Sequence, residues 1–197
     1  MDLWTDQIVA EYTGRPLMTE DYYEQIRLLF LFYRAVCNYE NNKKGLFGYF
    51  SKKNSLYLLS NTLQYLKDRD LIKGSKIGNQ SKGFSATKGV NIEARRQYKE
   101  WLLETVNMKK NNDQGESEIV EVPRLYTLRQ RALIQETIMW DNVGNFDRVS
   151  AVGALMLLRE ERLILGRGKT SSAEDLQSTQ KDYLGNDPFF TENFDNR

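Results

Sequence analysis

The sequence contains no histidine, one cysteine and three prolines among its 197 residues. The lack of histidine excludes Ser-His-Asp and Cys-His catalysis and any metal site built on imidazole. The single cysteine, Cys37, cannot form an internal disulfide, which fits a reducing compartment. A bound metal would therefore be a hard cation held by carboxylates, carbonyls and water. No apolar run is long enough to span a bilayer, so we expect no membrane contact.

The composition predicts one globular domain followed by a tail. Hydrophobic residues make up 40% of the chain and aromatic residues 12%, which is enough for a core. We place the domain at residues 1–165 and an acidic, flexible tail at residues 166–197. The net charge of +1 hides an asymmetry: residues 67–99 hold nine Lys and Arg against three acids, whereas residues 171–197 hold six acids against two basic residues. Such blocks usually mark interaction surfaces or tails.

Apolar periodicity predicts an α/β fold in which strands and helices alternate. The first elements, strand, helix and strand, have the order of a parallel crossover. Loops are expected at residues 74–89 and 107–118. Strands are expected at residues 8–13, 36–40 and 56–59, and helices from Thr19 or Glu20 to Tyr33 and at residues 43–53, 63–71, 91–104, 127–139 and 147–165.

The strand at residues 36–40 ends on a carboxylate, Glu40. Ligands of open α/β sheets bind outside the carboxyl ends of strands. Two amides and the lysines Lys43 and Lys44 follow, so this stretch is a candidate for metal and phosphate chemistry. The alternative is that Glu40 is an ordinary solvated residue at a strand end.

A second candidate carboxylate, Asp147, lies in the first turn of the last predicted helix. Small residues on the same helix face, Ala151 and Ala154, would let that helix lie close to a sheet. The alternative is that Asp147 only caps the helix. If both acids converge, they could share Mg²⁺ or Mn²⁺, and two-metal phosphodiester cleavage needs no histidine.

Three runs resemble a known family: residues 7–16 (QIVAEYTGRP), 39–47 (YENNKKGLF) and 145–151 (NFDRVSA). They are similar to the C-terminal nuclease domain of the large terminase subunit of tailed bacteriophages, in the form found in crAss-like phages. The resemblance covers about residues 7–165, and the tail run 187–194 (DPFFTENF) is similar to tails of the same group.

The resemblance implies an RNase H-like fold, a mixed sheet flanked by helices, and a magnesium- or manganese-dependent endonuclease that cuts concatemeric double-stranded DNA during viral genome packaging. Glu40 and Asp147 match two of the family's acidic metal ligands. The implied partners are double-stranded DNA, an upstream ATPase domain, the small terminase subunit and the phage portal. The implied location is the cytoplasm of the bacterial host.

The first strands of the family's sheet, and the acidic residue that one of them carries, match nothing in this sequence, so the resemblance implies an N-terminally truncated domain. This leaves an alternative function, a non-catalytic fragment that binds DNA or docks onto the packaging motor. We expect Lys43, Lys44, Lys76, Lys82 and Lys88 to contact DNA phosphates. The tail, with Phe189, Phe190 and Phe194, would dock onto the portal or another motor component.

Overall fold

A computed structural model describes residues 1–42, 44–72, 81–111, 117–141, 144 and 146–169. The chain divides into two units, Met1–Arg159 and Glu160–Arg197, and each is described by itself. The described part of the second unit is the last part of one helix. The predicted flexible tail therefore lies almost entirely outside the described residues.

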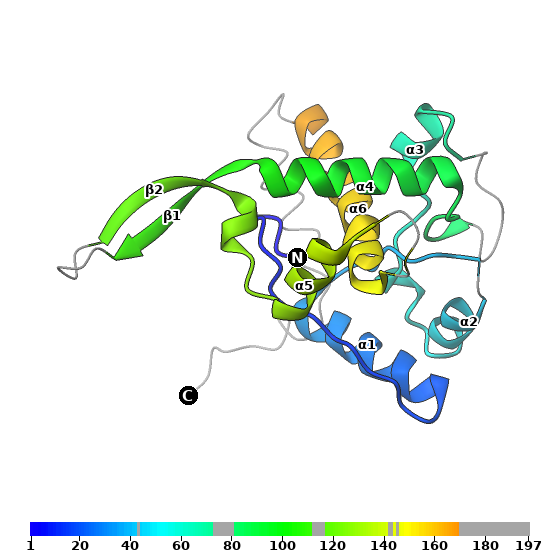
Figure 1. Cartoon of the computed structure of the whole chain (residues 1–197). Helices are drawn as coiled ribbons and strands as arrows, with labels where there is room; N and C mark the ends of the chain where they lie inside the picture. The colour runs from blue at the N-terminus through cyan, green and yellow to red at the C-terminus, as the bar shows by residue number, and fades with distance from the viewer. Residues whose placement is uncertain (43, 73–80, 112–116, 142–143, 145, 170–197) are drawn as a thin grey trace, which may run out of the picture. The chain divides into compact units, whose positions relative to one another are not determined.

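The secondary structure is mixed α/β, and helices predominate among the described residues (Figure 1). The two strands form one antiparallel sheet, β1 (Thr105–Asn111) and β2 (Ser117–Pro123). The α-helices are α1 (Thr19–Tyr33), α2 (Gly45–Lys52), α3 (Gln64–Asp68), α4 (Lys88–Leu103), α5 (Arg131–Met139) and α6 (Asp147–Lys169), and the short 3₁₀ helices are η1 (Leu56–Leu58) and η3 (Arg124–Thr127).

The helix predictions are confirmed in number and order, with shifted ends. The helix expected from Asn91 begins three residues earlier, because the Thr87 hydroxyl accepts a hydrogen bond from the Val90 amide and caps α4 at 3.3 Å. The helix expected at 127–139 begins only at Arg131, as α5, and the 3₁₀ helix η3 precedes it and ends at Thr127.

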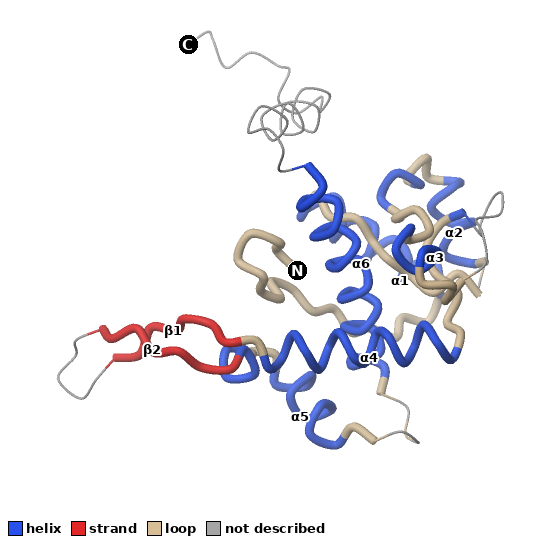
Figure 2. Tube along the Cα trace, turned by 90° about the horizontal axis from the view of Figure 1, so that it is seen from above, coloured by secondary structure: helices blue, strands red, loops and turns tan. Residues whose placement is uncertain are grey.

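Helices α4 and α6 cross at the centre of the first unit (Figures 1 and 2). Small residues permit their close approach, since a Cβ added at Gly153 would lie 3.2 Å from the Ala94 Cβ. In one core cluster, Val90 and Leu157 pack with Leu66 and Phe84. A second cluster forms from Tyr98, Trp101, Leu102, Leu133, Val149 and Met156.

A third cluster joins α1 and α2 to the extended segment that contains Cys37 and Tyr39. Phe50 of α2 is fully buried there, together with Leu58 and Leu59. The expected strand at 56–59 is wrong for its first three residues: the Leu58 amide bonds to the Ser55 carbonyl and the Leu59 amide to the Leu56 carbonyl, which makes a 3₁₀ turn.

The expected strand at residues 8–13 is also wrong, since these residues pair with no strand. Side chains fix this segment instead. Gln130 donates its amide to the Ile8 carbonyl at 2.8 Å, Glu11 pairs with Arg148, and the Tyr12 hydroxyl donates to Gln25. A segment with the composition of a strand is therefore held here by side-chain hydrogen bonds and an ion pair to residues far along the sequence, which its own sequence cannot reveal.

Residues 107–118 do not form the expected polar loop. Residues 107–111 and 117–118 belong to β1 and β2, which pair in register from Thr105 with Pro123 to Asn111 with Ser117. Residues 112–116 lie outside the described residues. The charged residues of this stretch face solvent. They make the sequence polar on average, so that the alternating apolar residues Val106, Met108, Val120 and Val122 were not recognised as parts of strands.

Candidate functional site

Glu40 ends an extended segment, as its position in the sequence suggests. The segment pairs in parallel with two others: Cys37 bridges to Leu59, and Glu40 bridges to Phe84. A third bridge, between Asn61 and Lys82, joins those two segments to each other in the antiparallel sense. Three short extended segments thus replace the strands of a full sheet at this place.

The Asn41 side chain fixes the turn that follows Glu40 through hydrogen bonds. Its side chain is 7% exposed, its amide donates to the Lys82 carbonyl at 2.8 Å, and its carbonyl oxygen accepts from the Ser85 hydroxyl at 3.0 Å. The carboxylate of Glu40 is exposed and accepts a 2.6 Å hydrogen bond from the Asn42 amide. The backbone here is well fixed, and the acid it presents faces solvent.

Asn38 connects this segment to α6. Its side-chain amide donates to the backbone carbonyl of Ala154 at 2.8 Å, and its Oδ1 accepts from the Ser60 hydroxyl at 3.2 Å. The helix that begins at Asp147 is therefore anchored directly to the segment that ends at Glu40. Sequence reasoning overlooked Asn38 because an asparagine within a predicted strand gives no sign of its partner.

Asp147 is exposed in the first turn of α6, but the backbone amides there are capped by another residue. Glu136 of α5 accepts hydrogen bonds from the Arg148 amide at 2.7 Å and the Val149 amide at 3.1 Å. The Arg148 side chain also pairs with Glu136 and with Glu11. Since Glu136 caps these amides, the Asp147 carboxylate is left to face solvent.

The described residues do not assemble a complete two-metal site. Among them, no group of three His, Cys, Asp or Glu side chains converges closely enough to hold a metal ion. Asp147 and Ala154 are also separated by seven residues, or about 10 Å along the helix axis. The Asn38 contact links the elements that carry Glu40 and Asp147, and it lies about two turns of α6 away from Asp147.

The five candidate lysines have different environments. Lys44 and Lys88 are exposed, at the starts of α2 and α4. Lys82 is partly buried, and its ammonium donates to the Leu59 carbonyl at 3.0 Å, which ties two extended segments together. Lys43 and Lys76 lie outside the described residues.

The contact of Lys82 gives a prediction that separates folding from DNA binding. Lys82→Met keeps the length of the side chain but removes the hydrogen bond, and we expect the free energy of unfolding to fall by about 1–2 kcal/mol. Exposed Lys44 and Lys88, changed together to Glu, should instead weaken duplex binding and flatten its salt dependence. Urea denaturation and fluorescence anisotropy with labelled duplex DNA measure the two effects. Loss of DNA affinity in Lys82→Met with unchanged stability would contradict this assignment.

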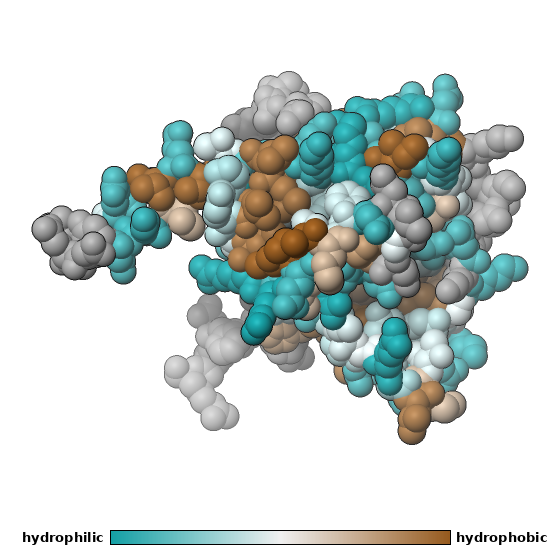
Figure 3. All heavy atoms as spheres, viewed as in Figure 1, coloured by the Kyte–Doolittle hydropathy of each residue, from teal (hydrophilic) through white to brown (hydrophobic). Residues whose placement is uncertain are grey.

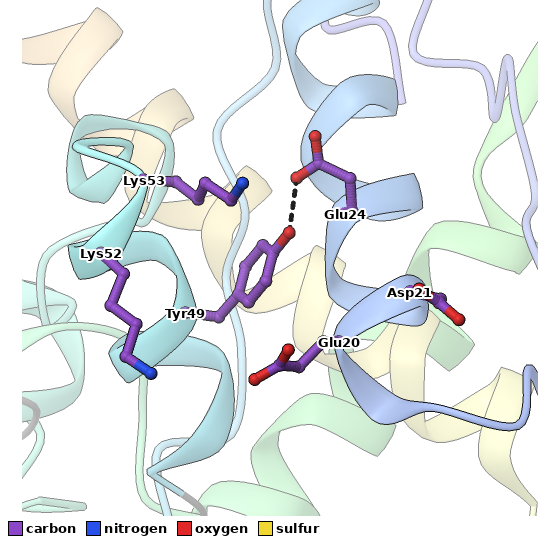
Figure 4. Close-up of a pocket in the computed structure, with 6 residues that line it drawn as sticks. All are labelled: Glu20, Asp21, Glu24, Tyr49, Lys52 and Lys53. Carbon is purple, nitrogen blue, oxygen red and sulfur yellow. Dashed lines mark hydrogen bonds between the residues drawn. The ribbon is translucent and has the colours of Figure 1, made fainter.

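A cleft of about 320 Å³ lies elsewhere, between α1 and α2 (Figure 4). Acids of α1, Glu20 and Glu24, face Tyr49 and Lys52 of α2 and the following Lys53 across it. The Arg27 guanidinium and the Tyr49 hydroxyl donate hydrogen bonds to Glu24 and lower the pKa of its carboxyl to about 2. Glu24 pairs with Arg27 on its own helix, and neither Glu40 nor Asp147 lines the cleft, so we assign it no role.

No family model, curated protein or solved structure matches the chain. Within the residues that the structure describes, none of the helices is both long enough and apolar enough to cross a membrane.

Proposed function

We propose that the chain is part of the nuclease domain of a phage DNA-packaging terminase, with Glu40 and Asp147 as ligands of a divalent metal ion. The observation that carries the proposal is the hydrogen bond from the Asn38 amide to the Ala154 carbonyl. It ties the segment that ends at Glu40 to the helix that begins at Asp147. Both acids are exposed, as ligands of a metal that must meet DNA have to be.

An RNase H-like fold belongs to this proposal. It is supported by the two parallel bridges of the Cys37–Glu40 segment, to Leu59 and to Phe84, and by the helix α6 anchored to that segment. The sequence resemblance of residues 7–16, 39–47 and 145–151 is the second support. In this interpretation the three bridged segments form one end of the RNase H-like sheet.

The ligand atoms determine which metal ion can bind here and what chemistry it could support. Carboxylate oxygens suit Mg²⁺ and Mn²⁺, and two of them with water ligands are enough for one loosely held ion. Hydrolysis by two metals needs further anionic ligands, which the described residues do not bring together. We therefore derive no cleavage step from this chain alone and propose that cleavage requires a carboxylate from outside the described residues.

Metal titration tests the assignment. The full chain should bind one Mn²⁺ weakly, with a dissociation constant of about 0.1–1 mM by calorimetry, because carboxylates must compete with water for the ion. Glu40→Gln and Asp147→Asn should each weaken binding by about tenfold or more, since each removes one charged ligand. Both side chains are exposed, so the fold is retained.

Glu121→Gln, an exposed acid of β2, is the matched control and should bind Mn²⁺ as the wild type does. If the Glu40 and Asp147 variants bind Mn²⁺ as tightly as the control, neither residue is a ligand and the assignment is wrong.

A second function is favoured by the absence of a third converging acid among the described residues. In it the chain is a non-catalytic module that binds double-stranded DNA or docks onto the motor, with Lys44 and Lys88 on its DNA surface. The upstream ATPase domain, the small terminase subunit and the portal are its proposed partners, in the host cytoplasm. Duplex binding with no Mn²⁺ binding would favour this function over the first.

A further inference from the structure

The β1–β2 hairpin extends beyond the helices of the first unit (Figures 1 and 2). The long antiparallel pairing is the only multi-residue sheet of the described chain. A two-stranded hairpin is marginally stable by itself in water, and both of its outer edges lack a neighbouring strand. The side chains of the hairpin must therefore contribute to its stability.

The two faces of the hairpin differ in chemistry. Residues directly opposite one another in an antiparallel pair point to the same face, and so do residues two apart on one strand. The register therefore places Val106, Met108, Val120 and Val122 on one face, which we call the apolar stripe. All four are only partly buried. Figure 3 shows hydrophobic side chains exposed on the hairpin.

A pair of opposite charges ends the stripe. Lys110 lies opposite Glu118 on the same face, one step beyond the Met108 and Val120 pair. The basic residue is on β1 and the acidic one on β2. This arrangement makes the face self-complementary under one particular symmetry operation.

We propose that the apolar stripe is the contact surface for a second copy of this chain. Two sheets pack face to face about 10 Å apart. A twofold axis between them, parallel to the strands, places β1 of each copy over β2 of the other. Lys110 of one copy then meets Glu118 of the other, twice, while the four apolar side chains of each copy are buried between the sheets.

The charges also select this axis over the other possible one. A twofold axis perpendicular to the strands would place β1 over β1 in opposite directions, and Lys110 would then face the apolar end of the stripe near Val106. That arrangement desolvates a charge without pairing it, which is costly. The proposed dimer has its two hairpins pointing the same way.

The expected dimer is weak. A stable interface buries about 800 Å² on each partner, and a stripe of four half-buried side chains offers less. We expect a dissociation constant of about 10–100 µM, visible as a concentration-dependent mass in sedimentation velocity. Val120→Glu should make the chain monomeric, because it places a charge in the middle of the stripe.

Ile119→Glu is the matched control. Ile119 is the next residue on β2, is 65% exposed and points to the opposite face, opposite Lys109. This variant should dimerise as the wild type does. A wild-type chain that is monomeric up to several times the expected dissociation constant, or equal loss of the dimer in both variants, would overturn the proposal.

Charge exchange separates contact between copies from stability of the hairpin. Lys110→Glu and Glu118→Lys should each weaken self-association by about tenfold, because like charges face each other twice across the twofold axis. Each variant also places like charges opposite within its own hairpin. Mixing the two variants does not change that internal repulsion, but it pairs Glu at 110 with Lys at 118 and Lys110 with Glu118 between copies.

The mixture should therefore form a heterodimer with near wild-type affinity, and the double variant should form a homodimer again. A mixture that stays monomeric while the wild type dimerises would place the interface elsewhere. The outcome is independent of metal binding by Glu40 and Asp147.

Discussion

Gly83→Ala is expected to destabilise the first unit by about 3 kcal/mol or more, since a left-handed backbone and a steric clash both oppose the new methyl group. Gly83 has a φ of +66°, where residues other than glycine are disfavoured. A Cβ at this position would collide with the backbone carbonyl oxygen of Tyr39 and with its ring. Backbone atoms cannot move aside as the end of a flexible side chain can.

The position explains why the effect is large. The Gly83 amide donates to the Ser60 carbonyl at 2.9 Å, and the next amide, of Phe84, donates to the Tyr39 carbonyl at 3.0 Å. At Gly83 the hydrogen-bond partner of the chain thus changes from the segment that contains Ser60 to the segment that contains Tyr39. A shift of this residue would break the pairing that positions Asn41 and, with it, Glu40.

Urea denaturation followed by circular dichroism measures the loss. Gly48→Ala in α2 is the matched control, because a Cβ there meets nothing within 4 Å. In the middle of a helix this change should raise the free energy of unfolding by about 0.5–1 kcal/mol. Equal urea midpoints for Gly83→Ala and the wild type would contradict the clash.

The helices could be predicted from the sequence because the buried positions of a helix recur at a regular spacing within a short stretch of sequence. In α1 the apolar positions follow the helical period, and Ile26 at the centre of the pattern is the buried residue. The segment that ends at Glu40 could also be predicted, since an apolar run leads to a carboxylate between two helices. Its partners could not: the Asn38 side chain reaches Ala154, which is 116 positions away.

The hairpin was missed for a different reason. Its sequence is polar on average, and only four of its residues alternate as a buried strand would. The cap of α6 was missed because Glu136 lies 12 positions before Arg148, whose backbone amide donates a hydrogen bond to it. Whether Glu40 and Asp147 bind metal stays a prediction, because the anchored framework fixes their elements and leaves both carboxylates in solvent.

A partly buried group of charges gives the second large expected effect. Asp6, in the N-terminal segment, accepts two hydrogen bonds from the Arg159 guanidinium, at 2.7 and 2.6 Å. Arg124 reaches the same carboxylate at 2.8 Å and also pairs with Glu104. The Trp101 indole donates to Asp6 at 3.2 Å. Asp6 thus shares with Glu104 the compensation of two guanidinium groups whose side chains are only 10% and 14% exposed.

Asp6→Asn should lower the free energy of unfolding by about 3 kcal/mol, because it keeps the shape of the side chain and leaves the half-exposed Glu104 as the carboxylate that faces two mostly buried guanidinium groups. Urea denaturation at neutral pH measures the loss. Glu121→Gln, an exposed acid of β2, is the control and should stay within about 0.5 kcal/mol of the wild type. A loss no larger than that of the control would mean that Glu104 alone balances both arginines.

The pH dependence of this loss identifies its origin. Burial by itself would raise the pKa of Asp6, but the hydrogen bond and charge of Arg159, with the charge of Arg124, outweigh it and leave the pKa below the ordinary value of 3.8. A carboxylate with a lowered pKa stabilises the fold above its unfolded pKa, and the contribution is lost as the pH falls through the folded value. The difference in unfolding free energy between wild type and Asp6→Asn should therefore be constant from pH 7 to about 5 and shrink below about pH 4. Glu24, whose lowered pKa acts in the same range, is common to both proteins and cancels. A difference that stays constant down to pH 3 would show that the loss comes from packing and not from the charge of Asp6.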